Sequence, residues 1–78
     1  MNSVTLIGTV EEPIDERAFV LAVEHALVPV RIRSCHSLPA AGDRVVVEGS
    51  LHDGPVALRV DAATMHVASH HMLQYGRG

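Results

Sequence analysis

The stretch from Gly42 to Val60, GDRVVVEGSLHDGPVALRV, contains two β-rich runs separated by a turn. The first run has three consecutive valines at 45–47, and β-branched residues fit a pleated surface. Asp53-Gly54 tolerates positive φ, and Pro55 lacks an N–H, so it belongs at the margin of the returning strand. Gly49 has no side chain to pack, which is typical of a bulge or a sharp bend. We therefore predict a bent β-hairpin, which favours a small barrel.

The rest of the chain supplies three more β patterns. Five strands are predicted, at residues 3–11, 17–24, 28–34, 43–51 and 55–67. Pro13 should end the first strand, and residues 25–27 form a very short link between the second and third. Residues 34–41 are too short, and too interrupted by proline, for more than one helical turn. Five short strands with a connector between the third and fourth fit the OB-fold, an all-β barrel that often binds oligonucleotides.

Alternation along these strands predicts the core. The side chains expected to point inward are Val4, Leu6, Val10, Phe19, Leu21, Val23, Val28, Val30, Ile32, Leu58 and Val60. With one Phe, one Tyr and no Trp in 78 residues, this core consists of small aliphatic side chains. Residues 18, 20 and 22 are apolar as well, so we expect the outer face of the second strand to be partly covered.

Length and composition predict one domain over residues 1–68 and a flexible tail over residues 69–78. No apolar run approaches the roughly 20 residues of a transmembrane helix. The first residues lack the basic segment of a secretory signal, and the single cysteine is compatible with a reducing compartment. We therefore expect a cytoplasmic protein.

The arginines are the candidate binding residues. The formal net charge is −3, the wrong sign for a protein that grips phosphates over its whole surface, so any such contact must be local. Arg31 and Arg33 are two residues apart on one strand and therefore share a face. With Arg17 and Arg59 on neighbouring strands they could form a cationic stripe. The alternative is a solvated face whose arginines pair with acidic residues, namely Glu24, Glu48 or Asp61.

The sequence gives little support to a metal site or to an enzymatic function. His66, His70 and His71 lack a carboxylate or thiol at a spacing that would complete a metal site, so we interpret them as part of an unstructured, histidine-bearing tail. Cys35 and His36 are adjacent in a strand-like segment and would point to opposite sides, which argues against a nucleophile and base. We predict a protein that is not an enzyme and that has neither a metal site nor a cofactor.

Four segments resemble, in order, the bacterial single-stranded DNA-binding protein family. They are Met1–Val10 (MNSVTLIGTV), Phe19–Val23 (FVLAV), Val28-Pro29-Val30 and Gly42–Leu51 (GDRVVVEGSL). The resemblance covers residues 1 to about 68 and implies an OB-fold that binds single-stranded DNA in replication, repair or recombination. It also implies pairing through the first strand, and so a homodimer or homotetramer. The uncharged run from Asn2 to Val10, a strand edge without charge or proline to block it, points the same way.

Departures from the family pattern leave two hypotheses open. The family stacks bases on aromatic side chains, which are missing here, and Arg33 stands close to a position where the family commonly carries tryptophan. The shortened loops resemble the primosomal relatives of the family. The first hypothesis is a DNA-binding module that relies on contacts between arginines and phosphates. The second is an adaptor that has lost most DNA binding and docks a replication or repair protein.

Overall fold

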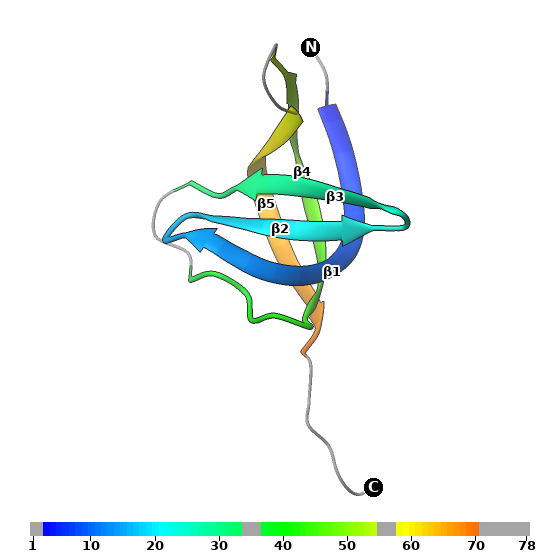
Figure 1. The fold of residues 1–78 in the computed structure, drawn as a ribbon, viewed down its shortest axis with the longest axis vertical. Helices are drawn as coiled ribbons and strands as arrows, with labels where there is room; N and C mark the ends of the chain where they lie inside the picture. The colour runs from blue at the N-terminus through cyan, green and yellow to red at the C-terminus, as the bar shows by residue number, and fades with distance from the viewer. Residues whose placement is uncertain (1–2, 34–36, 55–57, 71–78) are drawn as a thin grey trace, which may run out of the picture.

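The computed structural model describes residues 3–33, 37–54 and 58–70, which form five β-strands. These are β1 (Ser3–Asp15), β2 (Ala18–Val23), β3 (Ala26–Arg31), β4 (Arg44–Asp53) and β5 (Leu58–Ser69). They close into a barrel in the order β1-β2-β3-β5-β4 (Figure 1). All neighbours are antiparallel except β3 and β5, which run parallel. This is the predicted five-stranded OB-fold. No helix in the described part of the chain is long and apolar enough to span a membrane.

β1 is long because it pairs with two neighbouring strands, β4 and β2. Residues 3–9 pair with β4, and residues 9–15 pair with β2. Gly8 lies just before this change of partner, where a Cβ atom would collide with the carbonyl oxygen of Ala22, so glycine allows the two strands to approach. The expectation that Pro13 ends the strand is wrong. Register shifts on both sides of Pro13 interrupt the regular ladder, so a residue without an N–H is accommodated.

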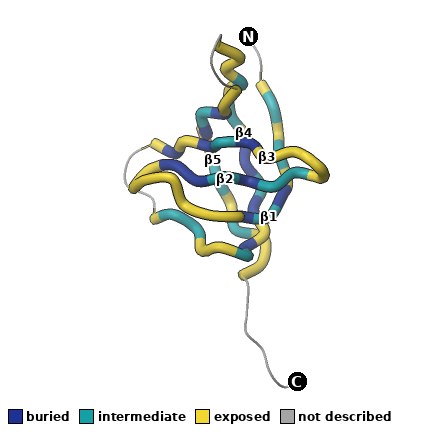
Figure 2. The backbone as a smooth tube through the Cα atoms, in the orientation of Figure 1, coloured by how far each residue is buried: buried dark blue, intermediate teal, exposed yellow. Residues whose placement is uncertain are grey.

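The barrel interior is filled by aliphatic residues and one phenylalanine, as predicted. The largest fully buried side chains are Phe19, Leu21, Val30, Val45, Val47 and Val60. Val4, Leu6 and Val23 are half-buried and pack against this core from its edges. Figure 2 shows the buried positions gathered where the five strands cross, with exposed residues at the turns. On the outer face of β2, Ala18 is buried and residues 20 and 22 are half-buried, so that face is partly covered, as expected.

The turn between β2 and β3 is tighter than predicted. Val23 and Ala26 are paired, which leaves only Glu24 and His25 between the strands. β3 therefore begins at Ala26 rather than at 28, and it ends at Arg31 rather than at 34. Glu24 adopts φ 56°, a left-handed conformation that costs a residue with a Cβ on the order of 1–2 kcal/mol. Glutamate is not a typical turn residue, so the sequence pattern did not reveal the turn.

The hairpin of β4 and β5 forms as predicted, with Asp53 opposite Leu58 at its end. A register shift falls between Glu48 and Gly49, where Ala63 of β5 is the extra residue, so the irregularity expected at Gly49 is present but the bulged residue lies on the facing strand. A Cβ on Gly49 would meet the backbone of Asp61 and would lie 2.8 Å from the Cα of Ala62. Leu58 was expected to point inward but is 41% exposed, because it pairs with Asp53 at the end of the hairpin. Pro55 lies outside the described residues.

The connection into β4 is held by a buried carboxylate. Asp43 is 3% exposed, and its Oδ2 accepts a hydrogen bond from the backbone N–H of Ala40 at 3.0 Å. Its backbone carbonyl accepts the N–H of Val10 at 2.9 Å, which ties the connection to β1. Residues 37–41 contain no helix, in agreement with the prediction. β5 continues through Ser69, two residues beyond the predicted end, and residues 71–78 of the predicted tail lie outside the described part.

Candidate nucleic-acid interface

Three of the four candidate arginines line one open hollow of about 780 Å³ on the barrel surface. Arg17 comes from the turn after β1, whereas Arg31 and Arg33 come from the end of β3 and the residues that follow it. The remaining lining residues are Ile32, Ser50, His52 and Asp61. Three arginines and one aspartate give the hollow a formal charge of +2 when the histidine is neutral. The local charge is therefore opposite in sign to the −3 of the whole chain.

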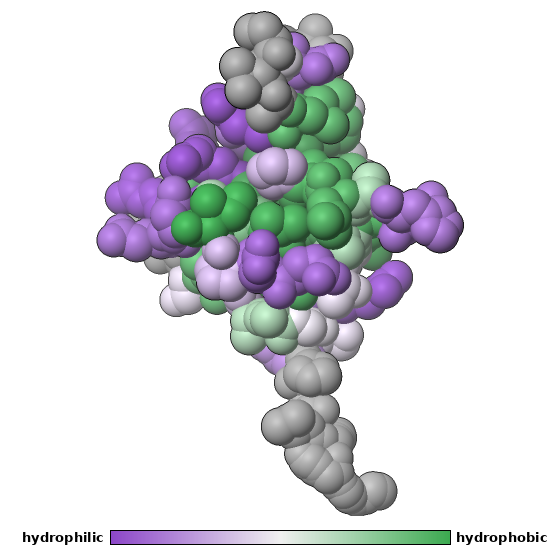
Figure 3. Space-filling view, in the orientation of Figure 1, coloured by the Kyte–Doolittle hydropathy of each residue, from purple (hydrophilic) through white to green (hydrophobic). Residues whose placement is uncertain are grey.

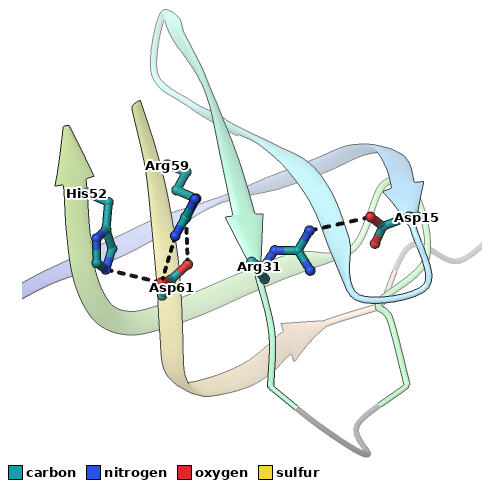
Figure 4. Close-up of polar contacts among 5 residues, drawn as sticks. All are labelled: Asp15, Arg31, His52, Arg59 and Asp61. Atoms are coloured by element: carbon teal, nitrogen blue, oxygen red, sulfur yellow. Dashed lines mark hydrogen bonds and ion pairs between the residues drawn. The ribbon is translucent and has the colours of Figure 1, made fainter. Parts of the chain in front are cut away.

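Asp15 organises the arginine side of the hollow. One carboxylate oxygen accepts the backbone N–H of Arg17 at 2.8 Å, which fixes the turn between β1 and β2. The other lies 3.6 Å from the guanidinium of Arg31, with both side chains about half exposed (Figure 4). The carbonyl of Arg17 accepts the backbone N–H of Ile32 at 2.8 Å, so this turn is tied to the end of β3. Backbone contacts therefore bring residue 17 beside residues 31–33, which are distant in sequence.

Asp61 of β5, the neighbour of Arg31 in the β3–β5 ladder, contacts two further side chains. Its Oδ1 accepts from the Nε of Arg59 at 3.0 Å, and its Oδ2 lies 3.1 Å from the Nε2 of His52 (Figure 4). His52 and Arg59 are cross-strand partners in the hairpin, so the three side chains share one outer face. Arg59 does not belong to the lining of the hollow in the described residues; it lies beside it, with its guanidinium turned to Asp61.

The arginines fall into two groups, those paired with carboxylates, as expected for a solvated face, and those exposed at the hollow, as expected for a binding surface. Arg59 pairs with Asp61, one of the acidic partners expected for a solvated face, whereas Glu48 accepts a hydrogen bond from Thr64 at 3.3 Å. Arg17 and Arg33 have exposed side chains at the hollow and carry no ion pair among the described residues. Sequence reasoning missed His52 and Ser50 as lining residues. The sequence did show that Ser50 and His52 are two residues apart and so share one face of β4. It did not show that this face lies beside Asp61.

The face beside the arginines is apolar. Cross-strand partners on the outer face of β2 and β3 include Val20 with Pro29 and Ala22 with Leu27. Leu27 is 66% exposed. Figure 3 shows an apolar area across this side of the barrel, with hydrophilic residues at both ends. The surface beside the arginines is therefore aliphatic rather than aromatic.

Of the histidine candidates, His66 and His70 belong to no metal-binding group in the described part of the chain. His66 is exposed on β5, and the Nδ1 of His70 lies 3.5 Å from Oδ2 of the buried Asp43. No group of three or more His, Cys, Asp or Glu side chains suited to a metal ion occurs among residues 3–33, 37–54 and 58–70. His71, Cys35 and His36 lie outside the described residues.

The first half of β1 has one strand neighbour only in the described part of the chain. Residues 3–8 pair with β4, and no strand lies along their other edge. Ile7 on this segment is 52% exposed. An uncharged edge of this kind is a template for pairing with another chain.

The comparisons with known proteins show the fold. No family model matches the chain, and no curated protein sequence matches it. Among solved structures, the hypothetical protein ygiW from E. coli has a TM-score of 0.68 at 20% identity, over 85% of this chain and 74% of that one. The N-terminal domain of PriB protein from Thermoanaerobacter tencongensis, described as dimeric, has a TM-score of 0.68 at 24% identity, over 88% and 98% respectively. At these identities, the likeness establishes that the chain folds as these small barrels do.

Proposed function

We propose that this chain is a single-stranded DNA-binding OB-fold protein without enzymatic activity, which acts in DNA replication, repair or recombination. The observation that carries the proposal is the hollow where Arg17, Arg31 and Arg33 meet on a barrel whose net charge is otherwise negative. The sequence resemblance to bacterial single-stranded DNA-binding proteins supports it. The structural likeness to PriB protein is consistent with it.

Phosphate contacts dominate the proposed binding mode. The described surface offers no aromatic platform beside the arginines, since the only Phe is fully buried and the only Tyr lies outside the described residues. Stacking on aromatics contributes about 1–3 kcal/mol per base in proteins that have them. Without it, the affinity depends on counterion release, and the slope of log K against log salt is about −0.7 for each phosphate contact on a single strand. Binding at low salt and steep loss towards physiological salt are therefore expected.

Charge reversal at the hollow tests the proposal. Arg31→Glu combined with Arg33→Glu should abolish the retardation of a labelled oligo-dT at low salt, because both guanidinium groups are lost and the carboxylates that replace them repel phosphate. Neither side chain belongs to the core, so the circular dichroism spectrum should remain that of the wild type.

A matched pair of single variants controls for net charge. Arg33→Glu and Arg44→Glu each change the charge by two units at an exposed position, but Arg44 opens β4 and does not line the hollow. Arg33→Glu should weaken binding at least several-fold more than Arg44→Glu. Equal losses would mean that general charge, rather than this hollow, governs the interaction, and no retardation of the wild type at the lowest salt would refute DNA binding.

The apolar outer face of β2 and β3 favours a second candidate, an adaptor for a replication or repair protein. Leu27 and its partner Ala22 expose aliphatic surface without base-stacking groups. An adaptor of this kind would fail to retard oligo-dT and would lose its protein partner when Leu27 is changed to Asp. A DNA-binding protein would retard oligo-dT and respond to Arg33→Glu.

We further propose that the protein assembles as a homodimer, or as a homotetramer built from dimers, through β1. The unpaired edge of residues 3–8 supports this, as does the family resemblance. The PriB domain with a similar fold is described as dimeric. Light scattering at tens of micromolar tests it, and a wild-type monomer there would contradict it.

A further inference from the structure

We infer that His52 is a proton-dependent contact to the nucleic acid, so that binding becomes stronger as the pH falls. This inference rests on the proposed function, because it concerns the same hollow. The starting observation is that Ser50, His52 and Asp61 form the wall of the hollow on β4 and β5, and that histidine is the residue type whose charge changes nearest to neutral pH.

The cluster of Arg59, Asp61 and His52 changes its charge by one unit on protonation. With a neutral imidazole, the guanidinium and the carboxylate balance, and the cluster is formally neutral. In that state Nε2 of His52 lies 3.1 Å from Oδ2 of Asp61. A protonated His52 keeps this contact, adds an N–H donor at Nδ1 and brings the cluster to +1. Since the side chain of His52 is 49% exposed, the new donor is available to a phosphate in the hollow.

The geometry allows one strand of DNA to meet both walls. β5 lies between β3 and β4 in the barrel, so the arginines of β3 and His52 of β4 are two strand spacings apart, about 10 Å. Stacked nucleotides advance about 3.4 Å each along the helix axis, and an extended single strand advances further, so about three nucleotides or fewer cover that distance. A strand that contacts Arg31 therefore has a phosphate within reach of the histidine wall.

The coupling between protonation of His52 and DNA binding involves every charged group around His52 in the described residues. Asp61 and Arg59 face it from β5, Asp53 follows it on β4, and the arginines lie across the hollow on β3 and the preceding turn. A bound phosphate neutralises the arginines and adds a negative charge, so DNA shifts the balance towards protonation. By linkage, protons in turn favour DNA, and the affinity must rise as the pH falls.

Fluorescence anisotropy with labelled oligo-dT at about pH 8 and about pH 5.5 tests this, because histidines change charge within this range. The wild type should bind about two- to five-fold more tightly at the lower pH, the range expected for one exposed ion pair. Its salt slope should become steeper by about 0.7, as for one added phosphate contact. His52→Gln should lose both gains, and His52→Lys, which is cationic throughout, should bind equally at both pH values.

His66→Gln is the matched control, since His66 is exposed on the neighbouring strand β5 but does not line the hollow. It should keep the pH response of the wild type. Binding that is sensitive to Arg33→Glu but unchanged by pH, or a full pH response in His52→Gln, would refute the role of His52 and leave the proposed function intact. Absence of binding at both pH values would refute both.

Discussion

Arg31 of β3 and Asp61 of β5 lie directly opposite each other in the parallel ladder that closes the barrel. The neighbouring pair in the same ladder is Val30 with Val60, and both of these side chains are fully buried. Closure of the barrel therefore places an acidic residue beside the arginines on the outer face. Asp61 itself pairs with Arg59 and His52, so the phosphates of a bound strand would meet a carboxylate in the middle of the cationic surface.

Asp61→Asn should strengthen binding to oligo-dT. The amide keeps the size of the side chain but removes the charge that neutralises Arg59 and repels phosphate. An increase in affinity of about two- to five-fold is expected at low salt, since exposed charge pairs contribute up to about 1 kcal/mol. Anisotropy titrations measure it. Asp53→Asn, at an exposed position that does not line the hollow, changes the net charge by the same unit, and an equal gain there would contradict a specific role of Asp61.

Gly49→Ala should destabilise the barrel. The added Cβ would collide with the backbone of Asp61 and crowd the Cα of Ala62 at 2.8 Å, and backbone atoms within a sheet cannot move aside cheaply. Overpacking of this kind costs about 1–3 kcal/mol, which urea unfolding followed by circular dichroism would resolve. Ser50→Ala, at the next and exposed position, should change the free energy of unfolding by less than about 0.5 kcal/mol. Equal stability of the two variants would mean that the bulge relaxes to admit a side chain.

The fold was predictable because its determinants are local. Alternating apolar residues identified the strands and most of the core, although Val45, Val47 and Ala62 are also buried and were not among the side chains expected to point inward. Gly49 indicated the irregularity in the pairing of β4 with β5. The errors arose where tertiary contacts override local preference. β1 continues past Pro13 because β2 pairs with it on the far side of the irregularity, and Glu24 takes up a left-handed conformation because the β2–β3 pairing extends to Val23 and Ala26.

The candidate site was predictable only in part. Alternation alone places Arg31 and Arg33 on one face, but the approach of Arg17 depends on backbone contacts between the first turn and the end of β3. The wall that contains His52 and Asp61 depends on the register of β4 against β5 and of β5 against β3. A bulge shifts that register by one residue, and no local pattern specifies which residues then face each other.

Asp43→Ala should lower the free energy of unfolding, at a position that does not line the proposed interface. Its buried carboxylate accepts the N–H of Ala40, and truncation would leave that donor without its partner in a part-buried place. A loss of about 1–3 kcal/mol in the free energy of unfolding is expected for such a group. Thermal or urea unfolding would measure it, with the exposed Asp53→Ala as the control. Affinity for oligo-dT at a temperature where the variant is folded should remain close to that of the wild type, because Asp43 does not line the hollow.

Ile7→Lys should weaken self-association through β1. Ile7 lies on the segment whose outer edge has no strand neighbour in the described residues, and in an antiparallel pair of β1 strands the two introduced lysines would come close together. Like charges across a strand pair cost up to about 1 kcal/mol, so the dissociation constant of the dimer should rise by about five-fold, in addition to the loss of apolar contact. Ile14→Lys is a matched control, because both isoleucines belong to β1 and both are 52% exposed, but Ile14 lies in the half that pairs with β2. Sedimentation velocity over a concentration series would separate the two variants, and an equal effect of both would place the interface away from the free edge of β1.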